Sequence, residues 1–451
     1  MKKFFRFFLY CLLFILLLPH STALAKELTP SKSGSGNTIT VTAKDGTPIG
    51  AIYVKWNKPV SPYKLLVDGD ELTCGEFGFL HEFIALDNPS VSVTFSLPEG
   101  ANFGIYEIRI FSDNDVPSDV QIWEPVCEHP DILLVSSHAD DEILFMGGII
   151  PTYVPQGARV TVAYMTEFFS TTPVREHEKL DGLWADGLRT YPICGNFKDV
   201  YCDDLKDAEK KYSLDDMTAF VADCIDTYQP QIVVTHDFNG EYGHGFHMLT
   251  AKAVAQALEQ ANYDVPKAYF HLYGENKLHM DLRTPIESLG GKTALDIAKD
   301  AYLQHKSQQW CWFYVSDTYK YSVADFGLYK TTVGEDENPT MLDHLTLRAE
   351  QERLEEEARR EAERLEQERL AAEAAEAAEK EKLAKIDEQL AAFQAEAEAN
   401  ALQAAEELAV LEKDLKSTQL RITFLVAIAV LLLVTCMVIM LFKLRNNKRR
   451  P

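Results

Sequence analysis

An uncharged apolar run near the C-terminus sets the strongest limit on how this chain folds. Residues 422–442 contain no charged side chain, and about 20 such residues are enough for a helix to cross a bilayer. Basic residues follow the run directly, and positive charge flanks the cytoplasmic end of a span. The sequence therefore predicts a single-pass cell-membrane protein with a transmembrane helix over 422–442. Its short basic tail, residues 443–451, is expected in the cytoplasm and its N-terminal part outside the cell.

The N-terminus has the layout of a secretory signal peptide. Three basic residues precede an apolar stretch, and Ala23–Ala25 offer a small-residue cleavage site. An uncleaved anchor is the alternative for residues 1–25. Residues 26–37 follow with several Ser, Gly and Lys, a composition that predicts a flexible linker.

Residues 341–420 predict a long helical stalk. The segment lacks Gly and Pro and is dominated by Ala, Glu, Leu, Lys and Arg, which are strong helix formers. Acids such as Glu361 stand three or four residues from bases such as Arg364, which adds small stabilising terms. Apolar residues at three- and four-residue steps from Ile386 to Leu415 suit a weak coiled coil, and hence a homo-oligomer. A single charged helix is the alternative.

The chain is strongly acidic. It has 69 Asp and Glu against 44 Lys and Arg, for a formal net charge of -25. Because basic residues concentrate at the two ends, much of this charge falls on the middle of the chain. An acidic surface repels nucleic acid and other polyanions, so no nucleic-acid partner is expected. A neutral or cationic ligand fits better, and acidity that serves solubility alone is the alternative.

Six cysteines lie between the two apolar ends. An even number in a secreted chain permits disulfides, and Cys194 with Cys202 is the best pair by spacing. Free buried cysteines are the alternative. The sequence contains no Cys-x-x-Cys, which disfavours a zinc site made of thiolates.

Residues 38–127 predict a small all-β, sandwich-like domain. Alternating stretches such as "TITVTA" and "SVSVTFSL" are separated by turn sequences such as "KDG". Trp56, Tyr63 and Trp123 are candidates for stacking on glycans, although aromatic residues in short strands usually belong to the core. A structural spacer is therefore the favoured role for this domain.

Residues 128–340 predict an α/β domain. Compact apolar strands such as "DILLVSS" and "PQIVVTHD" are separated by helical stretches. This alternation indicates a Rossmann-like, mostly parallel sheet with helices on both faces. In such sheets ligands bind beyond the carboxyl ends of the strands.

Two clusters of ionisable residues stand at such strand ends. "HADDE" at 138–142 follows one strand, and "HDFNGEYGHGFH" at 236–247 follows another. The rule for open α/β sheets brings both clusters to one edge. A hydrolytic zinc commonly takes two histidines and one carboxylate, and His138, Asp141 and His247 provide that set.

Three neighbouring side chains complete a catalytic hypothesis. Asp140 is left free to act as general base toward a metal-bound water. His244 lies three residues before His247, so a helix beginning there puts both imidazoles on one side. Tyr242 is placed to donate its hydroxyl to a developing oxyanion. Each piece alone is more often structural, and the joint presence of both clusters carries the hypothesis.

Over residues 131–337 the chain resembles the PIG-L/LmbE-like family, zinc-dependent de-N-acetylases of N-acetylglucosaminyl compounds. "HADDE" is similar to the family's His-Pro-Asp-Asp-Glu, and "THDFNGEYGHGFH" and "AYLQHKSQ" resemble two later motifs. Two departures stand out. Ala139 occupies the position of the proline, and Gly245-Phe246 replaces Pro-Asp between the two histidines.

The resemblance implies the same ligand set and the same three catalytic roles, with Zn²⁺ or another divalent ion as the metal. It adds Arg175 as a substrate contact, and Asp237 and Asn239 are further substrate-binding candidates. The implied reaction is hydrolysis of the acetamide of an N-acetylglucosamine-containing glycan or glycoconjugate at the cell surface. The alternative is a membrane-tethered glycan-binding protein with a degenerate catalytic domain.

Overall fold

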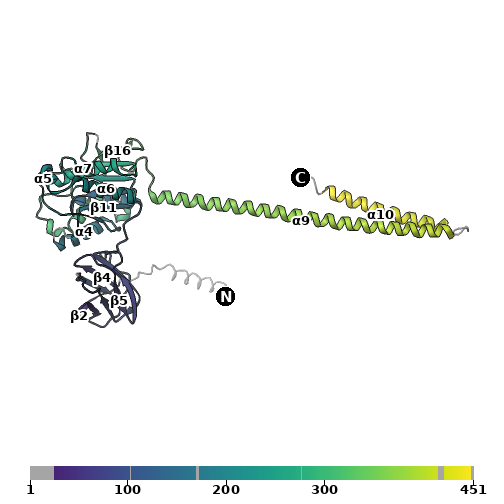
Figure 1. The fold of residues 1–451 in the computed structure, drawn as a ribbon, viewed down its shortest axis with the longest axis horizontal. Coiled ribbons are helices and arrows are strands. Elements are labelled where there is room, and N and C mark those ends of the chain that lie inside the picture. Colours follow the sequence, from purple (N-terminus) through teal and green to yellow (C-terminus); the bar gives the residue numbers. More distant parts are fainter. Residues whose placement is uncertain (1–24, 102, 169–171, 276, 415–420, 448–451) are drawn as a thin grey trace, which may run out of the picture. The chain divides into compact units, whose positions relative to one another are not determined.

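A computed structural model of the chain describes residues 25–101, 103–168, 172–275, 277–414 and 421–447 (Figure 1). The chain divides into two compact units, residues 1–353 and residues 354–451. Residues 1–24, which make up nearly all of the predicted signal peptide, lie outside the described residues.

The first part of residues 1–353 is an all-β domain. Its strands form two antiparallel sheets, with the orders β1-β9-β4-β7 and β2-β3-β8-β5-β6. Apolar side chains from both sheets share one core, where the Trp56 indole packs edge-on against Phe95 at a ring-centroid distance of 5.7 Å. The strands are β1 (Glu27–Leu28), β2 (Pro30–Ser35), β3 (Thr38–Ala43), β4 (Ile49–Trp56), β5 (Tyr63–Val67), β6 (Asp70–Cys74), β7 (His81–Ser90), β8 (Ser92–Ser96) and β9 (Ile105–Phe111).

The start of this domain corrects the linker prediction. Residues 26–37 contain β1, which pairs with β9, and β2, which pairs with β3 from Pro30 to Ser35. The polar side chains of β2 are mostly exposed, as expected of an edge strand. Backbone hydrogen bonds to β3 hold the segment, and a linker-like composition gives no sign of them.

The three aromatic residues suggested as glycan contacts in this domain belong to its core. Trp56, Tyr63 and Trp123 are 0%, 2% and 7% exposed. Trp56 Nε1 and Tyr63 OH donate hydrogen bonds to Glu82 Oε2 at 3.0 and 2.7 Å, so their polar atoms are satisfied inside the protein. The burial of these rings favours the structural role.

The described residues that follow form an α/β domain around a seven-stranded sheet of order β12-β11-β10-β13-β14-β16-β15. Strands β10 to β14 are parallel, whereas β16 is antiparallel to both β14 and β15. The sheet is therefore mostly parallel, as predicted. Its strands are β10 (Ile132–Ser136), β11 (Val160–Thr166), β12 (Ile193–Phe197), β13 (Ile232–Thr235), β14 (Lys267–His271), β15 (Leu278–His279) and β16 (Asp325–Thr331).

Helices cover both faces of this sheet. Successive residues of β10 alternate between two cores: Ile132 and Leu134 share one with α4 and α8, whereas Leu133 and Val135 share the other with α6 and α7. The alternation follows from the two-residue period of a strand. The helices are α2 (Asp141–Leu144), α3 (Ile149–Tyr153), α4 (Pro173–Asp186), α5 (Leu205–Lys211), α6 (Leu214–Tyr228), α7 (Gly245–Gln260) and α8 (Ala294–Tyr302).

Helix α4 also carries contacts between the two domains. His177 Nδ1 lies 2.8 Å from His81 Nε2 in the β-domain, and Lys55 Nζ lies 3.0 Å from Asp181 Oδ1. Arg175 belongs to the first turn of the same helix. The β-domain therefore supports the helix from which this predicted substrate contact projects.

Two long helices follow. Helix α9 (Arg348–Asp414) agrees with most of the helical prediction for residues 341–420, and exposed ion pairs such as Arg364 with Glu361 and Glu368 run along it. The predicted start is wrong, because residues 341–347 form turns and loop and Met341 is buried in the core. Helix α10 (Arg421–Asn447) contains Val426–Lys443, which is long and apolar enough to cross a membrane by length and composition. The coiled coil and the homo-oligomer stay predictions.

The cysteines of the described residues are all free, so the prediction of a bond between Cys194 and Cys202 is wrong. Lys179 Nζ lies 3.6 Å from Cys194 Sγ, whereas the Cys202 thiol donates to the Val200 carbonyl oxygen at 3.3 Å. The two sulfurs face different partners although they are close in sequence. The alternative of free buried cysteines is confirmed for Cys74, Cys202 and Cys224, whereas the other free cysteines are partly or fully exposed.

Candidate metal centre

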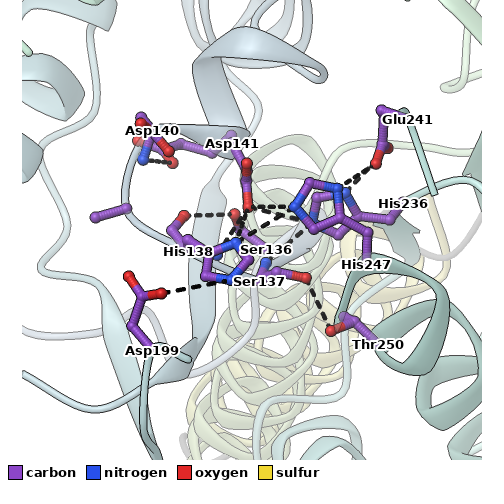
Figure 2. A network of polar contacts seen from close by, with 12 residues as sticks. Ser136, Ser137, His138, Asp140, Asp141, Asp199, His236, Glu241, His247 and Thr250 are labelled. Atoms are coloured by element: carbon purple, nitrogen blue, oxygen red, sulfur yellow. Dashed lines mark hydrogen bonds and ion pairs between the residues drawn. The ribbon is translucent and has the colours of Figure 1, made fainter. Parts of the chain in front are cut away.

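Two segments far apart in the sequence meet at the carboxyl edge of the sheet. Strands β10 and β13 are parallel neighbours, so the residues after Ser136 and those after Thr235 leave the sheet on the same side. The first segment turns into the short helix α2, and the second leads into α7. Figure 2 shows their polar side chains directed toward one another.

The three predicted metal ligands converge in this region (Figure 2). Asp141 Oδ2 lies 2.8 Å from His138 Nδ1 and 3.1 Å from His247 Nε2. The two imidazole nitrogens are 3.3 Å apart, and all three side chains are buried. Ligand atoms bound to tetrahedral zinc at about 2.0–2.1 Å lie roughly 3.3 Å from one another. The donor set and its spacing therefore fit one small divalent ion.

Glu241 is a buried carboxylate that the sequence analysis did not single out. His247 Nδ1 lies 2.5 Å from its Oε2, and Nδ1 of both His236 and His271 lies 3.0 Å from its Oε1. Hydrogen bonding to Glu241 turns Nε2 of His247 toward Asp141, an arrangement that orients metal-binding histidines in proteins. The sequence signal for Glu241 is its position in the cluster at 236–247, six residues before His247.

His236 is a neighbour of the centre rather than a further ligand. Its Nε2 accepts a hydrogen bond from the Ser137 N–H at 2.9 Å, so Nδ1 carries the proton and donates to Glu241. The same Nε2 is 3.9 Å from Asp141 Oδ2. With both nitrogens engaged, His236 joins the turn after β10 to the segment after β13.

The electrostatics of the centre favour positive charge. Burial alone would lower the pKa of His247, but Asp141 and Glu241 outweigh it and raise that pKa to about 10. Burial pushes the pKa of Asp141 up, yet His247 and His138 hold it well below its usual value. Two carboxylates thus stabilise a cation at the convergent donor atoms, where a metal ion would supply the same charge.

Asp140 stands beside the centre in a strained backbone conformation. Its φ of 117° lies in a region that non-glycine residues rarely occupy. The Asp140 N–H donates to Glu142 Oε2 at 3.0 Å, and Arg175 Nη2 lies 3.2 Å from Asp140 Oδ2. Burial raises the pKa of Asp140 to about 7, against the lowering effect of Arg175. A carboxyl with this pKa can accept and release a proton near neutral pH.

Arg175 connects Asp140 to a second acid. Its Nη2 donates to the Ala139 carbonyl oxygen at 2.8 Å, and its Nη1 donates to Asp199 Oδ2 at 3.0 Å. Asp199 Oδ1 lies 3.8 Å from His138 Nε2. Asp199 follows β12, where the sequence shows no cluster of functional residues, so its part in the site emerges from the fold alone.

His244 and Tyr242 lie on the other side of the donor atoms. His244 directly precedes α7, and its ring centroid is 4.7 Å from that of His247, as the helical spacing predicts. Burial lowers the pKa of His244 to about 2, so the imidazole is neutral. The Tyr242 ring is 5.3 Å from that of His244, and burial raises its pKa, which keeps the hydroxyl protonated.

These side chains line a pocket of about 610 Å³. One wall is aromatic: Phe313 lies 4.6 Å from Tyr242 and 5.5 Å from Phe145, measured between ring centroids. The remaining wall is formed by His138, Asp140, Asp141, Leu144, Arg175, Asp199, Tyr201, His244, Gln308, Trp310, Cys311, Trp312, Lys320 and Tyr321. Such a mixture of apolar surface and convergent polar groups is typical of small-molecule sites.

Residues 133–258 match the family model described as PIG-L: GlcNAc-PI de-N-acetylase. The chain carries a PIG-L family domain. The matched residues include both clusters at the carboxyl edge of the sheet. The β-domain and the helices α9 and α10 lie outside the match, and so does "AYLQHKSQ", to which the sequence resemblance extended.

Curated relatives cover part of the chain. The 1D-myo-inositol 2-acetamido-2-deoxy-alpha-D-glucopyranoside deacetylase of Mycolicibacterium gilvum (strain PYR-GCK) is 29% identical over 187 residues, covering 36% of this chain and 64% of that protein. The protein of the same name from Mycolicibacterium smegmatis is 30% identical over 172 residues, covering 32% and 59%. The chain therefore spans less than two thirds of the length of these relatives. Among solved structures, N,N'-diacetylchitobiose deacetylase from Pyrococcus horikoshii shows a TM-score of 0.30 and 17% identity, covering 39% of this chain and 70% of that chain.

The PIG-L domain accommodates its departure at Gly245-Phe246 through packing. A Cβ on Gly245 would lie 1.9 Å from the Asp204 carbonyl oxygen, so the glycine permits a close approach of the loop before α5. Phe246 is fully buried and stacks on Tyr212 at 4.3 Å between ring centroids. Both residues therefore serve packing between the two flanking histidines.

Asp237 and Asn239, two candidates for substrate binding in the PIG-L domain, form a local turn. Asp237 Oδ1 accepts hydrogen bonds from the backbone and side-chain nitrogens of Asn239 at 3.1 and 3.3 Å, closing a local turn. Neither residue is among the described residues that line the pocket. Such short turns are a common use of aspartate and asparagine, and the assignment of these two residues to substrate binding stays a prediction.

The motif "AYLQHKSQ" borders the PIG-L domain pocket although it lies beyond the match. The Ser307 N–H and hydroxyl donate to the two carboxylate oxygens of Glu178 at 2.9 and 2.6 Å. This pair of hydrogen bonds fastens the segment after α8 to helix α4. The segment then continues into the pocket wall at Gln308 and Trp310.

Proposed function

We propose that the chain is a cell-surface, metal-dependent de-N-acetylase that hydrolyses the acetamide of an N-acetylglucosamine-containing glycan or glycoconjugate. The observation that carries the proposal is the approach of two imidazole nitrogens and one carboxylate oxygen to within 3.3 Å of one another. That donor set leaves a position for water and is common in hydrolytic zinc sites. The relatives' name, a deacetylase of a 2-acetamido-2-deoxy-glucopyranoside, supports the same chemistry.

His138, Asp141 and His247 would hold Zn²⁺ or another divalent ion. Such an ion, when bound, supplies a Lewis acid and lowers the pKa of a water toward ~7. Glu241 keeps His247 in the tautomer that directs Nε2 at the ion. The buried carboxylate of Asp141, whose pKa is held low, stays ionised as a ligand must.

Asp140 accepts the proton of the attacking water in this mechanism. Its carboxylate lies next to the ligands in the chain, and Arg175 holds it at 3.2 Å. A base held in place with a pKa near neutrality contributes about 10²–10⁴-fold to rate. The same carboxyl then returns the proton to the amine nitrogen as the C–N bond breaks.

Tyr242 and His244 stabilise the oxyanion that forms from the acetamide carbonyl. Tyr242 keeps its hydroxyl proton and is a donor. His244 lines the pocket beside Tyr242, and its buried Nδ1 has no hydrogen-bond partner among the described residues. Removing one such preorganised donor typically costs roughly 3 kcal/mol of transition-state stabilisation.

The proposal places catalysis outside the cell. Helix α10 would anchor the chain in the membrane, with its basic end in the cytoplasm, and α9 would hold the globular part away from the bilayer. A membrane-tethered glycan-binding protein with a degenerate catalytic domain is the alternative. The presence of every side chain that the hydrolysis needs, and the burial of Trp56, Tyr63 and Trp123, favour the enzyme.

Acetate release by the full-length chain in detergent micelles tests the proposal. We expect release from N-acetylglucosamine compounds, loss of release with a chelator, and recovery when Zn²⁺ is added back. His247→Ala should abolish release, whereas His279→Ala should not, because the His279 side chain is 58% exposed and lies outside the described pocket wall. Release that persists in the chelated protein, or in His247→Ala, would contradict the proposal.

A further inference from the structure

The chain exposes two of its five tryptophans, and both line the mouth of the same pocket. Trp310 and Trp312 are 81% and 61% exposed, and no other large hydrophobic side chain among the described residues is as exposed as Trp310. Trp56 and Trp123 are buried, and Trp184 is partly buried. Exposed indoles that are confined to one site mark a binding surface rather than ordinary surface composition.

The segment that carries these indoles is held from its inner side. From Cys311 to Val315 its side chains alternate between inward and outward positions. The Phe313 ring packs at 4.6 Å from Tyr242, and the Phe313 N–H donates to Cys311 Sγ at 3.4 Å. Anchored inward residues fix the outward direction of Trp310 and Trp312, so the two rings are presented with little loss of freedom on binding.

A third exposed aromatic ring completes the mouth. Tyr201 is 63% exposed, and its ring centroid is 5.2 Å from that of His244. Asp140 and Asp199, two of the three acids that line the pocket, share Arg175 as their cationic partner. The mouth therefore offers flat apolar faces above a site in which acids outnumber this arginine, which suits a neutral ligand better than a polyanion.

We propose that Trp310 and Trp312 bind the sugar ring adjacent to the one whose acetamide lies at the metal centre. The substrate class that follows is an oligosaccharide or longer glycan that contains N-acetylglucosamine. Pyranose rings of this kind present flat C–H faces to an indole while their equatorial hydroxyls stay in water. A disaccharide is a ligand of drug size, and a pocket of about 610 Å³ is of the size that such ligands occupy. This inference rests on the proposed function.

We call the exposed rings of Trp310 and Trp312 the tryptophan platform. Measuring how binding depends on the number of sugar rings in the ligand tests this platform. The probes are N-acetylglucosamine and chitotetraose, titrated by calorimetry into the full-length, zinc-loaded chain in detergent micelles. We expect the variant Trp310→Ala/Trp312→Ala to raise the dissociation constant of chitotetraose about tenfold or more, and that of the monosaccharide less than about twofold. Trp310→Phe/Trp312→Phe, which keeps a flat ring at both positions, should recover most of the affinity for chitotetraose.

Tyr314→Ala is the matched control. Tyr314 is 53% exposed in the same segment but lies outside the described pocket wall, so this change should leave both dissociation constants unaltered. Equal losses for the monosaccharide and chitotetraose in the double variant would overturn the platform, and so would a Tyr314→Ala effect of the same size. Failure of the wild-type chain to bind chitotetraose more tightly than the monosaccharide would also overturn it.

The same samples separate this inference from the proposed function. If chitotetraose binds in a tryptophan-dependent way but no acetate is released, the platform stands and the deacetylase proposal fails. If acetate is released from both sugars with a rate that is unaffected in Trp310→Ala/Trp312→Ala, and binding does not depend on sugar number, the enzyme stands and the platform fails.

Discussion

Trp56 of the β-domain and two tryptophans of the α/β domain lie in opposite surroundings. Trp56 is fully buried in the β-domain, where its indole nitrogen donates to Glu82. Trp310 and Trp312 of the α/β domain are mostly exposed at the mouth of the pocket. The first holds two sheets together, and the other two present apolar faces to solvent.

Buried or partly buried acids differ between the two domains in the same way. Burial raises the pKa of Glu82, which accepts hydrogen bonds from neutral donors. Burial also pushes the pKa of Glu241 up, but His236 and His247 outweigh it and hold that pKa well below its usual value. The position of each acid in the fold explains the difference in pKa. Glu241 follows the carboxyl end of a parallel strand, where histidines from several segments contact it, whereas Glu82 lies on an antiparallel sheet.

The largest expected effect is on turnover when a carboxylate beside the metal centre is neutralised. Asp140→Asn should lower the rate of acetate release about 10²–10⁴-fold, because the amide cannot accept the proton of the attacking water. Bound zinc, measured by atomic emission, should stay at the wild-type amount. Glu82→Gln is the control from the β-domain and should retain the wild-type rate. A nearly normal rate for Asp140→Asn would show that Asp140 is not the general base.

Replacing a buried tryptophan should lower the stability of the fold, whereas replacing an exposed tryptophan should leave it nearly unchanged. Trp56→Ala should lower the free energy of unfolding by about 3–5 kcal/mol, since it leaves a cavity between the sheets. Trp312→Ala should change it by less than about 0.5 kcal/mol, as exposed substitutions usually do. Urea unfolding followed by circular dichroism measures both. Similar losses for the two variants would show that the exposed indole is a packing element.

A smaller effect is expected on metal affinity. Glu241→Gln should weaken zinc binding about 10–100-fold, because the amide orients His247 less strongly than a carboxylate does. Competition with a fluorescent chelator measures the affinity. Glu82→Gln should leave it unchanged. Equal zinc affinity in wild type and Glu241→Gln would mean that the buried acid only packs the histidines.

The smallest expected effect concerns the cysteines, which are free in both domains. Because those of the described residues are free, a reductant should shift the Tm of the chain by less than about 1 °C, whereas loss of a native disulfide typically costs 2–5 kcal/mol. Differential scanning calorimetry with and without reductant measures the shift. A fall of several degrees would indicate a disulfide after all.

The sequence predicted those parts of the fold that local patterns determine. Apolar runs at Ile132–Ser136 and Ile232–Thr235 are buried strands, and the clusters that follow them meet because parallel neighbours end at one edge. The pairing of His244 with His247 follows from helical spacing. Local patterns, together with the rule that ligands bind beyond the carboxyl ends of strands in open α/β sheets, therefore account for the predicted ligands.

Other parts depend on contacts that no local pattern contains. Glu241 becomes part of the site because His271 from β14 and His236, which follows β13, both contact its carboxylate. Asp199 becomes part of the site through Arg175 on α4. Residues 26–37 look like a linker because the hydrogen bonds that hold them belong to strands elsewhere in the chain. In each case the structural role of the residue depends on a contact partner that is distant in the sequence.

X-ray absorption at the zinc K edge of the full-length chain tests the metal centre most directly. His138, Asp141 and His247 predict a first shell of two nitrogen and one oxygen protein ligands with an additional water, and no sulfur. Asp141→Ala should lose the bound ion. Sulfur in the first shell, or a wild-type chain that binds no divalent ion at these residues, would contradict the proposed centre.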